Sequence, residues 1–146
     1  MKLSSALLCD VATIREGLLH LLGGGLNVLY RESYPASMQA TLALMLEGAE
    51  SDFRPAEAAS ILIQIHHGDA GGKVVGAIEG EIVAGPREDP GPYFITPLVF
   101  DLTPVRLAEP GSYVITAQLN ENEPLVLNFD SVQVPVNTGP PLGLDN

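Results

Sequence analysis

Residues 60–83 read SILIQIHHGDAGGKVVGAIEGEIV, and this stretch decides the fold class. In its first part the isoleucines recur at every second position, and this period of two predicts a half-buried strand. The residues expected on the outer face of that strand are Ser60, Leu62, Gln64 and His66. The second part alternates too, and one face is expected to carry Val74, Gly76, Ile78, Gly80 and Ile82. Residues 68–72, GDAGG, have the composition of a turn, so the stretch predicts a β-hairpin.

The same period of two recurs downstream of this hairpin. It is found over 98–102, 113–119 and 125–130. Turn-forming residues at 110–111 and 120–123 separate these segments. We therefore predict three further strands.

Upstream, residues 41–46, TLALML, have side chains that favour a helix. Pro35 and Gly48 nevertheless bound a segment of strand length, and we predict a strand here as well. One short helical turn is expected over 54–59, where Pro55 suits a first turn. About eight short strands with turns between them are typical of an all-β sandwich.

Three consecutive glycines, Gly23, Gly24 and Gly25, interrupt the apolar stretch LLHLLGGGLNVLY at 18–30. A helix over 15–22 capped by Gly23 is one interpretation, and a phosphate-binding loop is another. A phosphate loop is followed by a helix, whereas residues 26–30 look like a strand. We therefore interpret the stretch as a strand bent at the three glycines, which lets the chain pass from one sheet to the other.

Several short motifs together resemble a bacterial family of small Ig-like β-sandwich proteins that is described only as a domain of unknown function. The motifs are Cys9-Asp10, the apolar stretch with glycines at 21–25, Tyr34-Pro35 and Pro110-Gly111-Ser112-Tyr113. The resemblance covers 3–134, and it implies an Ig-like antiparallel β-sandwich of seven to nine strands but no particular activity. We expect this domain over 1–134. Residues 135–146, PVNTGPPLGLDN, have no period, and we expect a flexible C-terminal tail.

Charge and cysteine content narrow the possible partners and location. The chain has 18 acidic and 7 basic residues, a formal net charge of −11, and its cations form no run. Nucleic acids and anionic membrane surfaces would repel it. The single cysteine excludes a disulfide within the chain. The start imitates a lipoprotein signal, but the apolar segment between Lys2 and Cys9 is too short, and we expect a cytoplasmic protein.

Candidate metal ligands are few in the sequence. His66 and His67 are adjacent in a strand and point to opposite faces, although His67 and Asp69 share a side if the turn has begun. Calcium is a second possibility, since some sandwiches bind it through acidic loops. The acidic loop residues are Glu47, Glu50, Asp52, Glu88 and Asp89, with no Asp-x-Asp motif. We interpret both groups as solvated surface residues and predict no metal and no cofactor.

Candidate catalytic residues are equally sparse. Cys9 lies beside Asp10, and a neighbouring carboxylate disfavours the reactive thiolate, so a buried structural cysteine is expected. Glu79 and Glu81 share a strand face at a separation that would suit glycoside hydrolysis, but a solvated face explains them as well. We predict that the protein is not an enzyme.

The expected function is a cytoplasmic protein-binding or assembly module that forms a homodimer or a stable complex. Open sheet edges pair with other chains, and exposed apolar residues mark partner surfaces. The apolar residues expected on solvent-facing sides are Leu62, Val83, Val99, Val114 and Val126. Two alternatives stay open: a small-molecule or Ca²⁺-binding sandwich, and a structural subunit of a larger particle.

Overall fold

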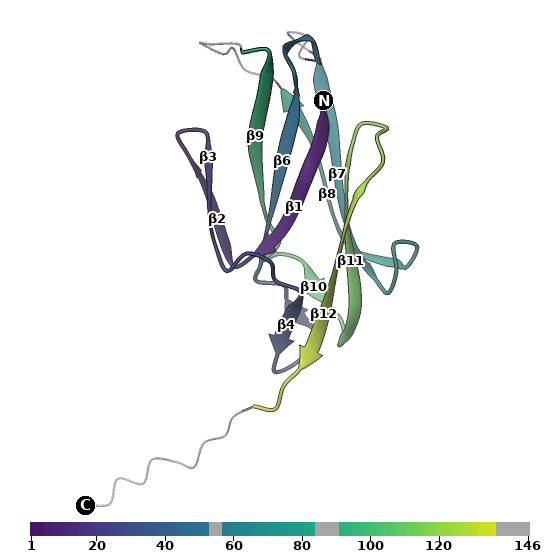
Figure 1. Ribbon diagram of the computed structural model, residues 1–146. Coiled ribbons are helices and arrows are strands. Elements are labelled where there is room, and N and C mark those ends of the chain that lie inside the picture. The colour runs from purple at the N-terminus through teal and green to yellow at the C-terminus, as the bar shows by residue number, and fades with distance from the viewer. Residues whose placement is uncertain (53–56, 84–90, 137–146) are drawn as a thin grey trace, which may run out of the picture.

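The computed structural model describes residues 1–52, 57–83 and 91–136 and is all-β with several sheets (Figure 1). Within these residues the one helical element is a 3-10 turn at Glu50–Asp52. A three-stranded sheet has the order β1-β6-β9, with β1 at Lys2–Cys9, β6 at Thr41–Ala49 and β9 at Tyr93–Asp101. A five-stranded sheet has the order β4-β12-β11-β7-β8. Its strands are β4 Val28–Arg31, β12 Leu125–Gln133, β11 Gly111–Leu119, β7 Ala58–His67 and β8 Lys73–Val83.

Two small sheets complete the described fold. β2 at Val11–Arg15 pairs with β3 at Leu18–Leu22, and this hairpin stands beside β9 at the margin of the three-stranded sheet (Figure 1). β5 at Ala36–Ser37 pairs with β10 at Arg106–Leu107.

The apolar core lies between the three-stranded and five-stranded sheets. One cluster of buried side chains joins the inner faces of both. It includes Leu8, Leu42 and Leu44 from the first sheet and Ile61, Ile63, Ile65, Tyr113, Ile115 and Phe129 from the second. The strand predicted at 41–46 from its bounding residues is confirmed as β6. The strands predicted from the period of two at 98–102, 113–119 and 125–130 are confirmed as β9, β11 and β12, with bounds that differ by a few residues.

The predicted hairpin at 60–83 is confirmed as β7 and β8, but its register breaks near the turn. Ile65 pairs with Gly76 whereas His66 pairs with Val74, so Val75 is an extra residue in β8. This bulge reverses the faces beyond it. Val75 packs against the core and Val74 is exposed, which corrects the predicted face of Val74.

His66 is a second correction, because its side chain is buried rather than solvent-facing. Its Nδ1 lies 3.3 Å from the carbonyl oxygen of Gly72 and its Nε2 lies 3.3 Å from the hydroxyl of Thr116. Gly72 in the turn and Thr116 in β11 therefore give this buried imidazole its hydrogen-bond partners.

The glycines at 23–25 lie between two strands of different sheets rather than inside one strand. β3 ends at Leu22 in the small hairpin, and β4 begins at Val28 and runs parallel to β12. Gly23 and Gly25 have φ values of 62° and 85°, in the region that favours glycine. The amides of Gly25 and Leu26 both donate to the Leu8 carbonyl at 2.9 Å, so the link is fastened to β1 while it crosses between the sheets.

Two further expectations concern segments that are only partly described. The helical turn expected over 54–59 falls on residues 54–56, which lie outside the described residues, and on Ala58 and Ala59, which begin β7. The tail expected over 135–146 lies outside the described residues from 137 onward.

Candidate functional site

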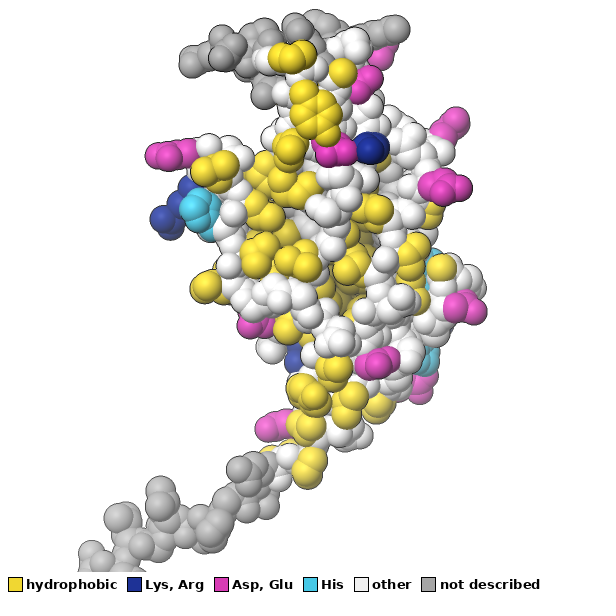
Figure 2. All heavy atoms as spheres, in the orientation of Figure 1, with side chains coloured by type: hydrophobic (Ala, Val, Ile, Leu, Met, Phe, Trp, Pro, Cys, Tyr) yellow, Lys and Arg dark blue, Asp and Glu magenta, His cyan; other side chains and the backbone are white. Residues whose placement is uncertain are grey.

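The outer face of the three-stranded sheet carries mainly apolar side chains. Across its strands Leu7 pairs with Ala43, and Ala43 pairs with Val99. The next outward-facing row is Ser5, Met45 and Pro97, and Ile95 follows beside Glu47. Figure 2 shows apolar side chains gathered where β6, β9 and the β2–β3 hairpin lie. Ile95 and Tyr93 are each more than half exposed.

The β2–β3 hairpin exposes apolar side chains on both of its sides, although its outer side also carries polar residues. Its register pairs Ala12 with Leu21 and Ile14 with Leu19, and these four residues form what we call the inner side. The outer side carries Val11, Thr13, Arg15, Leu18, His20 and Leu22. Leu22 is 72% exposed and Leu18 is 64% exposed. An isolated two-stranded hairpin is marginally stable in water, and this one leaves these leucines exposed.

The inner side of the hairpin turns toward the sheet. A β-carbon built on Gly24 would lie 2.6 Å from Leu21 Cδ1 and 2.9 Å from Leu7 Cδ2. Leu21 of the hairpin and Leu7 of the sheet therefore converge over this glycine. We use the name apolar face for the continuous surface that comprises Leu7, Met45, Ile95 and Val99 of the sheet with Ile14 and Leu21 of the hairpin.

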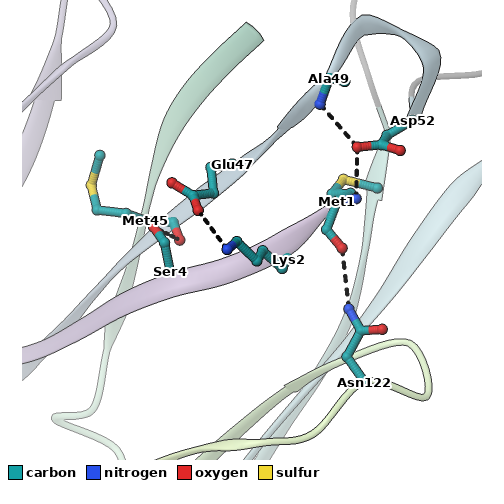
Figure 3. Close-up of polar contacts among 8 residues, drawn as sticks. All are labelled: Met1, Lys2, Ser4, Met45, Glu47, Ala49, Asp52 and Asn122. Atoms are coloured by element: carbon teal, nitrogen blue, oxygen red, sulfur yellow. Dashed lines mark hydrogen bonds and ion pairs between the residues drawn. The ribbon is translucent and has the colours of Figure 1, made fainter.

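The charged groups at one end of the apolar face are paired with each other (Figure 3). Lys2 Nζ lies 3.1 Å from Glu47 Oε1, and a hydrogen bond from Tyr93 together with Lys2 lowers the pKa of the Glu47 carboxyl. The same hydrogen bond raises the pKa of Tyr93.

A second polar cluster lies next to this end. Asp52 Oδ2 accepts from the Met1 amine at 2.8 Å and from the Ala49 amide at 2.9 Å, which lowers the pKa of Asp52. Asn122 donates to the Met1 carbonyl at 3.1 Å. These contacts join the start of β1 to the loops that contain Asp52 and Asn122. This end of the apolar face is therefore polar, but its charged groups neutralise each other in pairs.

The outer face of the five-stranded sheet is different in character. Glu79 and Glu81 of β8 pair with Leu62 and Ser60 of β7 and are exposed. A shallow, open depression beside them is lined by Ser60, Ile61, Leu62, Glu79, Gly80 and Glu81. Gln64, Thr116 and Asn128 continue this face across the sheet. This outer face also exposes Val74, Val83 and Val126. The two outer faces of the domain therefore differ in charge, because exposed carboxylates lie among the apolar residues of this one.

The residues considered as metal ligands are not brought together. His67 Nδ1 lies 3.3 Å from Glu109 Oε1, and its ring lies 4.8 Å from that of Tyr113. Asp69 Oδ1 instead accepts from the Gly71 amide at 2.9 Å. Glu88 and Asp89 lie outside the described residues, and within the described ranges no three His, Cys, Asp or Glu residues form a metal-binding group.

Cys9 is a buried structural residue, as expected. Its side chain is 0% exposed and its Sγ donates to the Thr41 carbonyl at 3.4 Å. Burial, and then the neighbouring Asp10 carboxylate, raise the pKa of the thiol. The reactive thiolate is therefore disfavoured at this position.

The apolar residues expected on solvent-facing sides divide three ways. Val83 and Val126 are exposed, whereas Leu62 and Val99 are half-buried. Val114 is only 5% exposed, which corrects the expectation for it. It lies on the central strand β11, between His66 of β7 and Asn128 of β12, and these cross-strand neighbours cover it.

Sequence reasoning missed the hairpin at 11–22. Its turn residues, Glu16 and Gly17, have φ values of 51° and 73°, the pattern of a tight two-residue hairpin turn. The Glu-Gly pair between two apolar segments was the available signal, although it is weaker than Asn-Gly or Asp-Gly.

The chain matches the model of DUF6941, a family of unknown function, over residues 4–131, and it belongs to this family. No curated protein matches it. Among solved structures, it is similar to the Pseudomonas fluorescens alkylpurine DNA glycosylase AlkC bound to DNA containing an abasic site analog. The identity is 15% and the TM-score 0.39, with 74% of this chain and 28% of that chain covered. A likeness this distant supports no inference about this chain.

Among the residues that the structure describes, no helix has the length and apolar composition needed to cross a bilayer.

Proposed function

We propose that this chain is a non-enzymatic protein-binding or assembly module and that its binding site is the apolar face together with Leu18 and Leu22 on the outer side of the hairpin. The observation that carries the proposal is the β2–β3 hairpin, which exposes leucines on a two-stranded element that pairs with no other strand in the described part of the chain. Burial of apolar surface is the main driving force of protein association. A hairpin of this composition gains that burial from a partner.

The contrast between the two outer faces supports the same proposal. The face of β7 and β8 carries exposed carboxylates, as a solvated sheet face does. The apolar face carries one charged pair, Lys2 and Glu47, and these residues already neutralise each other. A contiguous apolar surface of this kind is typical of a protein-interaction site.

We further propose that the domain is an Ig-like sandwich. In chain order β1, β6 and β9 take the places of strands A, B and E, and β7, β11 and β12 take those of C, F and G, with β8 as an added C′ strand. The Tyr113 hydroxyl donates to the Glu109 carbonyl at 2.6 Å near the start of β11, as in the tyrosine corner of such domains. In this scheme β2 and β3 are an insertion between β1 and β4. An insertion that the core does not need is a natural place for a binding element.

The proposed location is the cytoplasm, and the proposed partner is a protein rather than a nucleic acid or a membrane. A net charge of −11 and a single buried cysteine support both points. A role as a subunit of a larger particle would use the same apolar face. A small-molecule or Ca²⁺-binding role stays an alternative proposal without a site of its own in the described residues.

Site-specific photo-crosslinking tests the proposed function. A photoreactive residue replaces Leu18 on the hairpin, and the matched control carries it at Val126, which is also exposed but lies on the other sheet. We expect covalent protein adducts, including adducts between copies, from position 18 only. Adducts that form equally well from position 126, or no adduct from position 18 in cells that express the protein, would contradict the proposal.

A further inference from the structure

We infer that the partner of the apolar face is a second copy of this chain, in a two-fold clasp in which each hairpin enters the angle between the partner's hairpin and sheet. This inference rests on the proposed function and specifies the binding partner. Its first support is the hairpin itself, which projects beside β9 (Figure 1). It exposes Ile14 on its inner side and Leu18 and Leu22 on its outer side.

Apolar side chains exposed on two opposite sides are buried only where each side has a covering surface. In the clasp the inner side of one hairpin meets the inner side of the other across the two-fold axis, so Ile14 and Leu19 of both copies pack together. The outer side of each hairpin, with Leu18 and Leu22, then lies on the sheet surface of the partner around Ile95 and Val99. A two-fold contact of this type is self-complementary, because an arm and its receiving surface are both present on each copy.

The distribution of charge favours this face for self-association. With a net charge of −11, two copies repel each other unless their acidic groups are kept apart. Contact through the outer face of β8 would oppose Glu79 and Glu81 to their own equivalents. Contact through the apolar face keeps these carboxylates of the two copies away from each other. The two surfaces that then face each other carry little net charge.

The hairpin also offers one complementary charge. Arg15 is exposed on the outer side, at the tip of the hairpin. Asp101 is exposed at the end of β9, where the base of the hairpin lies. When the strands of the two copies run in opposite directions, the tip of one hairpin reaches the base end of the other copy, and Arg15 faces Asp101. The clasp thus places the Arg15 guanidinium of each copy opposite the Asp101 carboxylate of the other copy.

The mass of the protein in solution as a function of concentration tests the clasp. Sedimentation of the wild-type chain should give twice the chain mass of 15.4 kDa, with dissociation on dilution. Leu22→Asp should weaken the dimer by about 100-fold or more, because a carboxylate would be buried against the partner's sheet. The matched control Val126→Asp, on the outer face of β12, should leave the dimer intact.

A geometric test uses Ile14→Cys, since the one natural cysteine is buried. Mild oxidation should join two copies of this variant by a disulfide at the two-fold axis and should not join copies of Val126→Cys. A wild-type chain that stays monomeric at all concentrations overturns the clasp, as does a dimer that Val126→Asp breaks and Leu22→Asp does not. If adducts form from position 18 with a different protein while the chain is monomeric, the proposed function stands and the second copy is excluded.

Discussion

Leu7 of β1 and Leu21 of β3 converge over the backbone of Gly24, at the point where the hairpin leaves the sheet. A β-carbon at residue 24 would stand 2.9 Å from Leu7 Cδ2 and 2.6 Å from Leu21 Cδ1. The absence of a side chain at this position leaves room for the ends of both leucine side chains. A larger residue at 24 would therefore have to displace them.

Gly24→Val is expected to lower the free energy of unfolding by about 1–3 kcal/mol, as overpacked sites do. Urea denaturation of the two proteins measures the difference. In a Leu21→Ala background one of the two obstructing methyl groups is gone, and the cost of Gly24→Val should fall. An equal cost in both backgrounds would mean that the convergence of Leu7 and Leu21 does not restrict residue 24.

Two adjacent glycines in the β7–β8 turn should respond very differently to alanine. A β-carbon at Gly72 would lie 2.0 Å from the carbonyl oxygen of His67, and backbone atoms cannot easily move away. At Gly71 the nearest atom would be Asp69 Oδ1 at 3.4 Å, an ordinary contact. Gly72→Ala should cost about 2 kcal/mol or more, and Gly71→Ala should change stability by less than about 0.5 kcal/mol. Thermal or urea unfolding of both variants decides, and similar losses at the two positions would contradict this turn geometry.

The Tyr113 hydroxyl should contribute measurably to stability. The side chain is 1% exposed and donates to the Glu109 carbonyl at 2.6 Å. Tyr113→Phe removes the donor and should cost about 1–2 kcal/mol, whereas Tyr30→Phe, at a position 61% exposed, should be nearly neutral. Chemical denaturation of both variants tests the corner that supports the Ig-like proposal, and a neutral Tyr113→Phe would remove that support.

The hairpin at 60–83 shows what the sequence can and cannot predict about the fold. Alternation of Ile61, Ile63 and Ile65 predicts the strand and its buried face correctly, because a half-buried strand must repeat every two residues. The faces of Val74 and Val75 are set by the bulge opposite Ile65 and His66. A bulge is a property of two paired strands, so the sequence of one strand does not contain it.

The candidate site was only partly predictable for a related reason. Of the apolar residues expected on solvent-facing sides, Val99 lies in the apolar face, whereas Val83 and Val126 are exposed on the other sheet. Val114 is covered by neighbours on two other strands. The hairpin at 11–22 was missed because its strands, VATIR and LLHLL, carry apolar residues on both sides and do not alternate regularly.

The Glu47 carboxylate should make stability depend on pH in the acid range. A hydrogen bond from Tyr93, and then Lys2, lower its pKa from the ordinary value of 4.5. Because the folded pKa is the lower one, the stabilising contribution is complete above the unfolded value and is lost as the pH falls through the folded value. Glu47→Gln should thus be less stable than the wild type near neutral pH, and the difference should shrink below about pH 4. Urea midpoints measured across this range test the prediction, with Glu81→Gln on β8 as the control, and a difference that grows on acidification would contradict it.

Hydrogen exchange should show that the β2–β3 hairpin is the least stable of the described strands in the monomer and is protected in the dimer. Strands β7 and β11 lie inside the five-stranded sheet and contribute Ile63, Ile65 and Ile115 to the core, whereas the hairpin has only one paired neighbour for each of its strands. Local opening is easiest where few apolar contacts must be broken. Amides of the hairpin should therefore exchange quickly in Leu22→Asp and markedly more slowly in the wild type at high concentration, while those of β7 and β11 should be equally slow in both. Mass spectrometry of the two proteins at matched concentrations measures this exchange. If exchange in the wild-type hairpin does not depend on protein concentration, the hairpin is not covered by a second copy.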